Sequence, residues 1–306
     1  MRRWFALPLL CLAVPALAQD APVPAPPPPT LADQLTFGEN EARMTVPVQI
    51  AGAGPYQFII DTGAQRTVIS RELARTLGLA AGRGVRVTAM TGSSDVDTVL
   101  IPSITVSTLG GTRIDAPALA GRDLGAPGML GIDTLQGHAL AIDFVSQTMA
   151  VTPSKRRPRR EVAHRPDEIV IYAKSLFGQL VVTDAYVGNQ RVRVILDTGS
   201  VVSMGNGALR RRLRSRPGAP IELVSVLGAS MTADYTVIDT IKLGDLSMNN
   251  LPIAFADAPP FARFGLADKP AILLGMDALK LFRSVRIDFA NRELRLALPR
   301  DVHRAS

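Results

Sequence analysis

Two Asp-Thr-Gly tripeptides contain the residues best suited to chemistry. Asp61 follows the apolar run 58–60, and Asp197 follows the apolar run 194–196, 136 residues further along the chain. Two carboxylates about 3 Å apart cannot both ionise, so one of them keeps a proton near neutral pH. The ionised carboxylate can take a proton from water as a general base, while the protonated one hydrogen-bonds a carbonyl oxygen as a general acid. This chemistry calls for no metal ion and no cofactor.

The residues that follow each aspartate suit a tight turn. Gly63 and Gly199 permit a sharp turn whose backbone amides face the carboxylates. Thr62 and Thr198 carry hydroxyls that could hydrogen-bond across a pseudo-two-fold axis and lock the two turns together. The simpler alternative is that each aspartate only satisfies the amides of its own turn, as aspartates in turns often do.

The next position differs between the two copies, with Ala64 in the first and Ser200 in the second. A hydroxyl that donates to an ionised carboxylate favours the charged form and lowers its pKa. Ser200 therefore predicts that Asp197 is the more readily ionised aspartate and that Asp61 carries the shared proton.

An internal repeat could place the two tripeptides on such an axis. Four landmarks occur in the same order in both halves of the chain: residues 58–64 and 194–200, 92–93 and 228–229, 129–133 and 273–277, and 142–144 and 287–289. The second half carries about eight extra residues, around 259–269. The repeat predicts two similar lobes, over residues 40–152 and 169–300.

The sequence pattern within each half is typical of β-structure. The 25 glycines and 23 prolines favour turns and short strands over a helical bundle. Ser70 predicts the cap of a short helix that ends at Gly78. Asp133 and Asp277 precede short helical patterns, and we expect them to cap helices.

A glycine-containing hairpin is predicted at the same distance, 31 residues, after each aspartate. In the first half, strands 85–91 and 96–101 would flank a turn at 92–95. Such hairpins suit mobile flaps that close over a substrate. The predicted flap and substrate-binding residues are Gly92, Ser93, Gly228 and Ala229.

Composition excludes several classes of site. The single cysteine, Cys11, rules out an intramolecular disulfide framework, Fe–S clusters and cysteine-based zinc sites. Three histidines make a His-ligated metal centre or a Ser-His-Asp triad a poor explanation. Aromatic residues are 5% of the chain, which argues against stacking platforms for single-stranded nucleic acid.

The N-terminus has the pattern of a secretory signal. Arg2 and Arg3 precede the apolar run 4–14, and a small-x-small cleavage site ends at Ala18. The apolar run is too short to favour stable membrane insertion. Residues 1–18 therefore predict export to the periplasm or secretion, and 19–39 a Pro-rich tether.

A basic segment, residues 153–168, separates the two predicted lobes. Together with Arg210–212 it could form a nucleic-acid patch, or it could be attracted to an anionic membrane surface. Runs of charge are usually solvated surface. We therefore interpret 153–168 as a solvated linker and expect no nucleic-acid partner.

The motifs resemble those of a known family. Asp61-Thr62-Gly63-Ala64, followed by Thr67-Val68-Ile69, resembles the active-site signature of retroviral-type (retropepsin-like) aspartic proteases. Leu130-Gly131 and Leu274-Gly275 resemble the family's apolar-apolar-Gly segment. The resemblance spans residues 40–300 and is to two lobes fused in one chain, of the bacterial exported type. It implies an all-β fold of two pseudo-symmetric β-barrel lobes with a cleft between them.

The same resemblance implies an aspartic endopeptidase that acts on a peptide or protein substrate, with Asp61 and Asp197 as its catalytic residues. The alternative is a peptide-binding or assembly module that kept the fold without the activity. In the second half Gly205-Asn206-Gly207 replaces an apolar continuation, which predicts a looser loop after Asp197. We expect a monomer, although a dimer of chains would offer the same carboxylate pairs.

Overall fold

The computed structural model describes residues 34–36, 38–40, 43–106, 109–158, 167–213 and 218–299. The predicted signal segment 1–18 lies outside the described residues, as do most of the predicted tether and the centre of the basic linker. Across the part of the chain that is described, β-strands predominate, and no helix is both long enough and apolar enough to cross a membrane.

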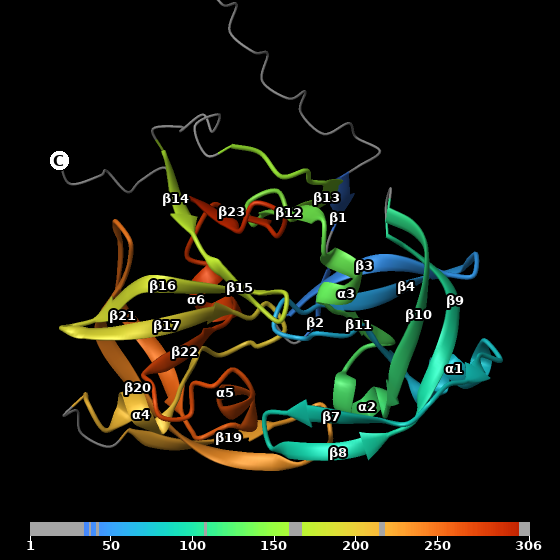
Figure 1. Ribbon diagram of the computed structural model, residues 1–306, viewed down its shortest axis with the longest axis horizontal. Helices are drawn as coiled ribbons and strands as arrows, with labels where there is room; N and C mark the ends of the chain where they lie inside the picture. The colour runs from blue at the N-terminus through green and yellow to red at the C-terminus, as the bar shows by residue number, and fades with distance from the viewer. Residues whose placement is uncertain are drawn as a thin grey trace, which may run out of the picture.

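The first half folds into a closed barrel of six strands (Figure 1). Their order around the barrel is β3 (Arg43–Ile50), β4 (Ala53–Ile60), β11 (Gly128–Leu130), β5 (Val68–Ser70), β10 (Leu109–Leu119) and β9 (Thr98–Val106). β9 pairs with β3 and closes the ring. Two short strands flank it, β2 (Gly38–Asn40) and β6 (Ala80–Ala81), and this half contains three helices, α1 (Arg71–Thr76), α2 (Gly121–Leu124) and α3 (Ile132–Leu135).

The second half repeats this barrel. Its strands follow the order β16 (Gln179–Val187), β17 (Gln190–Leu196), β22 (Ala271–Leu274), β18 (Met204–Gly205), β21 (Leu246–Phe255) and β20 (Ser230–Leu243), and β20 closes on β16. The flanking strands are β15 (Lys174–Leu176) and β19 (Ala219–Val224), and the helices are α4 (Gly207–Arg210), α5 (Pro259–Arg263) and α6 (Met276–Leu279). The eight or so extra residues of this half contain α5. The fold is therefore all-β, with two pseudo-symmetric barrels, as the sequence predicts.

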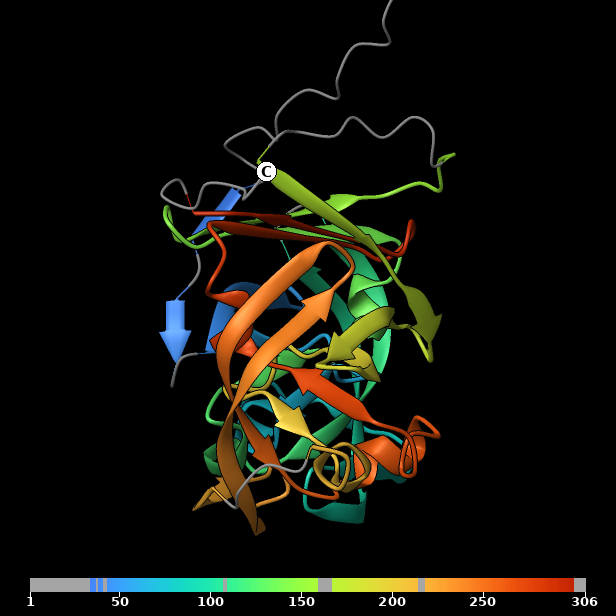
Figure 2. The ribbon, with the colours of Figure 1, turned by 90° about the vertical axis from the view of Figure 1, so that its left-hand side faces the viewer.

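A six-stranded antiparallel sheet joins the two barrels and lies across one end of both (Figures 1 and 2). Its order is β1 (Gln34–Thr36), β13 (Thr148–Pro153), β12 (His138–Asp143), β23 (Ser284–Asp288), β24 (Glu293–Ala297) and β14 (Glu168–Tyr172). The two halves meet where β12 pairs with β23, for example Ala141 with Arg286. The predicted lobes 40–152 and 169–300 are thus not independent, because each half contributes three strands to the shared sheet.

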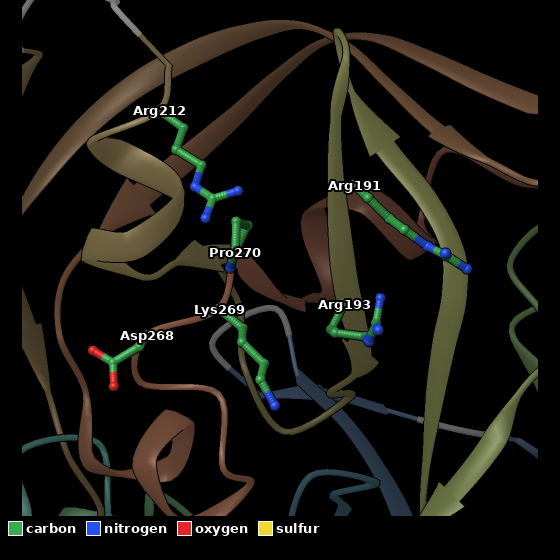
Figure 3. Close-up of a pocket in the computed structure, with 6 residues that line it drawn as sticks. All are labelled: Arg191, Arg193, Arg212, Asp268, Lys269 and Pro270. Atoms are coloured by element: carbon green, nitrogen blue, oxygen red, sulfur yellow. The ribbon is translucent and has the colours of Figure 1, made fainter.

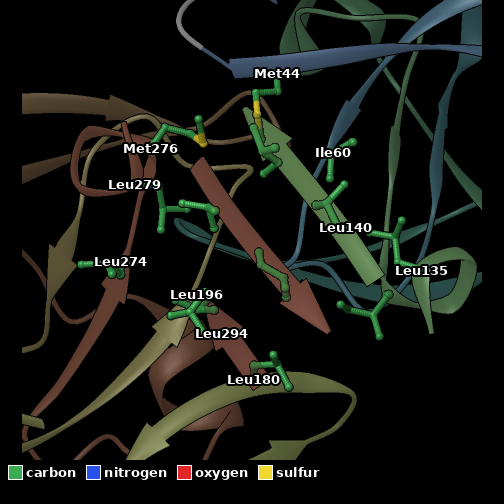
Figure 4. Close-up of a cluster of buried hydrophobic side chains, with 14 of the residues drawn as sticks. Met44, Ile60, Leu135, Leu140, Leu180, Leu196, Leu274, Met276, Leu279 and Leu294 are labelled. Carbon is green, nitrogen blue, oxygen red and sulfur yellow. The ribbon is translucent and has the colours of Figure 1, made fainter. Parts of the chain in front are cut away.

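One hydrophobic core runs through both halves beneath this sheet (Figure 4). Leu140 of β12 and Leu294 of β24 belong to it, together with Ile60 and Leu196, the residues that immediately precede the two aspartates. All four side chains are at most 1% exposed. Packing of the shared sheet therefore reaches directly to the strand ends that carry the Asp-Thr-Gly turns.

The structure differs from the predicted tether and linker at their edges. Residues 34–36 form β1, which pairs with β13, so the fold begins inside the segment 19–39 that the sequence assigns to a tether. Arg157, inside the predicted solvated linker, donates to Glu293 at 3.1 Å and lies 3.7 Å from the buried Asp288 carboxylate. These ion pairs hold the start of the linker against the shared sheet.

Two local predictions can be compared with the structure. The Ser70 hydroxyl accepts from the backbone N–H of Leu73 and caps α1, as predicted. The predicted turn at 92–95 is wrong: β7 (Val85–Ala89) pairs with β8 (Gly92–Val96), so Gly92 and Ser93 lie on a strand. The tip is the dipeptide 90–91, because Ala89 pairs directly with Gly92 and leaves only two residues for the turn.

Candidate active site

Asp61 and Asp197 occupy equivalent positions at the ends of β4 and β17. The backbone N–H of Asp61 donates to the carbonyl of Leu130, and that of Asp197 to the carbonyl of Leu274, both at 3.0 Å. Each strand is therefore held beside the apolar-apolar-Gly segment of its own half, β11 or β22. Both aspartates are only 9% exposed.

The two turns lie against each other. A Cβ atom on Gly63 would lie 2.7 Å from Cγ of Asp197, and one on Gly199 would run into the carboxylate of Asp61. Neither glycine has a positive φ, so glycine is required here by the close approach of the opposite aspartate rather than by the turn conformation. Each turn thus forms one wall of the other's carboxylate site.

The threonine hydroxyls cross between the halves in a symmetric exchange. Oγ1 of Thr62 donates to the carbonyl of Leu196 at 2.9 Å, and Oγ1 of Thr198 donates to the carbonyl of Ile60 at 2.8 Å. Each hydroxyl also accepts from the backbone N–H of the other threonine, at 3.1 and 3.2 Å. Because both threonines are buried, these four bonds fix the relative position of the two turns.

The carboxylates themselves are not equivalent. The amides of Gly63 and Ala64 donate to Oδ1 of Asp61 at 2.8 and 2.9 Å, whereas the amide of Gly199 donates to Oδ1 of Asp197 at 3.1 Å. The two carboxyl groups also share a hydrogen bond with each other. The backbone amide of Ser200 also favours the charged form of Asp197, so two backbone groups act on each carboxyl group, and the bond from Gly63 to Asp61 is shorter than its counterpart from Gly199.

Loss of water on burial raises the pKa of Asp61 and raises the pKa of Asp197 well above its ordinary value of 3.8. Hydrogen bonds from Gly63 and Ala64 offset part of this effect for Asp61, while the negative charge of Asp61 raises the pKa of Asp197 further. These directions favour Asp197 as the protonated member of the pair and Asp61 as the ionised one, which is the opposite of the expectation drawn from Ser200.

The reason for the reversal is the orientation of the Ser200 hydroxyl. Its Oγ donates to the carbonyl of Val202 at 2.8 Å and so does not donate to a carboxylate. Ala64 contributes its backbone amide to Asp61, which needs no side chain. The Ser200 hydroxyl therefore does not stabilise the charged form of Asp197, which the residue type alone does not reveal.

Two aspartates that the sequence assigns to helix caps support the turns instead. Asp133 accepts from the backbone N–H and the hydroxyl of Thr67, at 2.8 and 2.7 Å. Asp277 accepts from the same two groups of Ser203, at 2.8 and 2.6 Å. Each hydroxyl then accepts from the glycine of the apolar-apolar-Gly segment, Gly131 or Gly275. Their equivalent places in the repeat were the signal that could have identified this role.

The loop after Asp197 is firmly held, contrary to the prediction that it is loose. Asn206 is fully buried and makes four side-chain hydrogen bonds. Its Oδ1 accepts from the backbone N–H groups of Leu209 and Ala271, and its Nδ2 donates to the carbonyls of Leu266 and Lys269. One amide side chain thus ties α4 to the segment that follows α5.

A further contact between the halves was not predicted. Gln179, at the start of β16, is 1% exposed and donates from Nε2 to the carbonyl of Gly63 at 2.9 Å. The second barrel therefore holds the aspartate turn of the first. A lone glutamine before an apolar run carries no sequence signal for such a role.

Each hairpin reaches the opposite half. Met90, at the tip of β7–β8, packs against an apolar cluster of the second barrel that includes Phe261. Val226 and Leu227, in the turn between β19 and β20, pack against a cluster of the first barrel that includes Ile59 and Val68. The predicted flap residues Gly228 and Ala229 lie in this second turn.

No group of three or more His, Cys, Asp or Glu side chains in the described part of the chain could hold a metal ion. The two carboxyl groups, which the crossed threonines hold together, are suited to acid–base catalysis.

The comparisons with known proteins agree with this arrangement. The family described as aspartyl protease matches residues 46–134 and 183–278, so that each match covers one barrel and one Asp-Thr-Gly turn. No curated protein sequence matches the chain. Since the two matched regions together make up more than half of the sequence, the chain belongs to the retropepsin-like aspartyl protease family.

Proposed function

We propose that this protein is an aspartic endopeptidase that hydrolyses peptide bonds with a water molecule activated between Asp61 and Asp197. The observation that carries the proposal is the pair of buried carboxyl groups that the crossed threonine hydroxyls hold against each other, and the pKa values of both are raised. A pair with one proton between its members supplies a base and an acid at the same time.

In the proposed mechanism the ionised Asp61 takes a proton from the water molecule, and the water oxygen attacks the peptide carbonyl carbon. Asp197 donates its proton to the carbonyl oxygen, which gives a neutral tetrahedral intermediate. As this intermediate collapses, one of its hydroxyl groups returns a proton to Asp197, the C–N bond breaks, and the amine leaves with the proton that Asp61 accepted. The hairpin turns at 90–91 and 225–229 would cover the substrate and exclude bulk water during these steps.

The proposal is tested by replacing each aspartate separately. We expect Asp61→Asn and Asp197→Asn each to lower kcat/KM on a peptide substrate at least 10²- to 10⁴-fold, the usual contribution of a general acid or base. The matched control is Asp239→Asn, which makes the same change at an exposed position on β20 and should retain full activity. Circular dichroism would establish that all three variants fold.

Two results would count against an endopeptidase. One is a carboxylate variant that keeps most of its activity, because the pair would then not be the catalyst. The other is a wild-type protein that binds peptides but cleaves none from acid to neutral pH, which would favour the peptide-binding module instead.

Export to the periplasm or beyond is a separate part of the proposal and rests on the pattern of residues 1–18. Expression of the full chain in a Gram-negative host, followed by N-terminal sequencing of the periplasmic fraction, tests it. A mature chain that begins after Ala18 is expected, and an uncleaved chain confined to the cytoplasm would contradict it. Since one chain supplies both aspartates, we propose that the active form is a monomer.

A further inference from the structure

A basic pocket lies on the second barrel, on side chains that the carboxylate pair does not use (Figure 3). It has a volume of about 250 Å³. Three separate segments form it: strand β17, the residues after α4, and the loop that leads into β22. The lining residues are Arg191, Arg193, Arg212, Asp268, Lys269 and Pro270.

Four of these six residues are cations, and their charge is not compensated locally. Among the described residues none of the four forms an ion pair with a carboxylate. The single acid of the pocket, Asp268, points away from the guanidinium of Arg212 (Figure 3). Like charges in a concave surface repel one another and concentrate the local field, so the pocket attracts a compact anion.

The backbone beneath the cations is fixed in place. The N–H of Arg193 donates to the carbonyl of Pro270 at 2.9 Å, and the buried Asn206 donates to the carbonyl of Lys269 at 2.8 Å. Two guanidinium groups are also oriented: Nε of Arg191 donates to the carbonyl of Thr183, and Nη1 of Arg212 donates to Oε1 of Gln190. Each of these arginines keeps further N–H donors for a ligand.

The other half of the molecule shows that the fold does not require these charges. In the repeat, Arg191, Arg193 and Arg212 correspond to Pro55, Gln57 and Thr76, and Lys269 corresponds to Gly125. All four counterparts are uncharged, yet the first barrel has the same strand order. The four cations are therefore an addition to the second barrel rather than part of its architecture.

We propose that this pocket binds a phosphate group, either as free phosphate or as the phosphate of a lipid headgroup. Guanidinium groups match phosphate oxygens with paired N–H donors, and a lysine adds a compact positive charge. A phosphate dianion neutralises more of the four charges than one carboxylate does. The proposal is independent of the proposed proteolytic activity, because no pocket residue contacts either aspartate turn.

The first test titrates inorganic phosphate into the intact protein at constant ionic strength, by isothermal calorimetry or amide chemical shifts. The pocket variant is Arg193→Gln/Lys269→Gln, and the matched control is Arg75→Gln/Arg83→Gln, which removes the same charge from exposed positions on the first half. We expect saturable binding by the wild type and the control, and at least tenfold weaker binding by the pocket variant. Cleavage of a short neutral peptide should be the same for all three proteins.

The second test separates the two sources of phosphate. Vesicles that contain phosphatidic acid should retain the wild type and the control but not the pocket variant if the ligand is a headgroup, and vesicles of phosphatidylcholine should retain none. Binding in either the phosphate or the vesicle experiment that depends on the pocket residues supports the proposal. It is overturned if neither ligand binds, if the pocket variant binds as well as the control, or if an acidic peptide displaces phosphate at lower concentration than phosphate itself binds.

Discussion

The two aspartate turns are built on the same frame but supported differently around it. The backbone N–H of each aspartate donates to a leucine carbonyl of the neighbouring strand. In each half a second aspartate, Asp133 or Asp277, accepts hydrogen bonds from the loop that follows the turn. Beyond this frame the copies differ. The helix after the first turn is capped by one bond from Ser70, whereas the helix after the second is held by Asn206 with four.

The comparison shows that the hydrogen bonds that position the two turns are the same in both halves, whereas the charges of the two aspartates differ for another reason. The frame brings the carboxylates together by identical hydrogen bonds in both halves. Burial raises the pKa of both aspartates, and the charge of Asp61 raises the pKa of Asp197 further. A repeated fold can therefore supply an acid and a base from one residue type, because the charge of one carboxyl group raises the pKa of the other.

The largest difference between the halves should appear on removal of the two capping side chains. Asn206→Ala leaves the N–H of Ala271 and the carbonyl of Lys269 without their partner, while the N–H of Leu209 and the carbonyl of Leu266 keep a backbone partner. At about 1–3 kcal/mol for each buried group left unsatisfied, we expect a loss of roughly 2–6 kcal/mol in the free energy of unfolding. Ser70→Ala removes one cap and should cost about 1 kcal/mol. Urea unfolding of both variants measures the difference, and equal losses would show that Asn206 does not tie the second half together.

The next effect should be a pH-dependent gain in stability when Asp197 is replaced. The pKa of Asp197 is raised in the folded protein, so protonation of Asp197 stabilises the folded state. This stabilisation is fully present below the ordinary pKa of 3.8 and is lost as the pH rises through the raised pKa of the folded protein. The amide that replaces the carboxyl group in Asp197→Asn does not titrate and can still donate a hydrogen bond to Asp61. This variant should therefore have a higher Tm than wild type as pH increases from about 4 toward neutral.

Asp61→Asn is the comparison variant for this measurement. Its gain should be smaller, because the amides of Gly63 and Ala64 already stabilise the charge that it removes. Thermal unfolding of the three proteins between about pH 3 and 8 separates the two aspartates. A larger gain for Asp61→Asn would reverse the assignment of the shared proton.

The smallest effect should come from Ser200→Ala. The hydroxyl donates to the carbonyl of Val202, so its loss should cost about 0.5–1.5 kcal/mol of stability. It should leave the acidic limb of the kcat/KM–pH profile where the wild type has it. A profile displaced toward higher pH would mean that the hydroxyl does reach a carboxylate during the reaction.

The sequence alone was enough to predict the parts of the fold that occur in both halves. The two barrels and the positions of Asp61 and Asp197 follow from short motifs in the same order, since equivalent residues of a duplicated unit lie about a common axis. Local chemistry also identified the cap at Ser70, where a single hydroxyl decides the structure.

Features that depend on contacts between distant segments could not be predicted in this way. The shared sheet pairs residues such as Ala141 and Arg286, and no local pattern specifies that partner. Arg157 lies in a segment whose composition is typical of a solvated linker, and yet it forms an ion pair with Glu293. The sequence around Arg157 does not indicate this partner, because Glu293 lies on β24 in the second half of the chain. The turn at 90–91 was misplaced because the next four residues, Gly-Ser-Ser-Asp, have turn propensity while strand pairing determines their structure.

The shared sheet also sets the order in which the molecule can be completed during synthesis. β12 pairs with β23, a strand of the second half, so this junction between the halves forms only when both halves are present. A chain that stops before Ser284 already contains both Asp-Thr-Gly turns but lacks the strands that hold the two barrels together at that end. Closing such a long loop is entropically unfavourable until those strands arrive. The candidate active site is therefore coupled to a strand pairing far from it in sequence, so loss of the β12–β23 junction should loosen the carboxylate pair without changing either Asp-Thr-Gly turn.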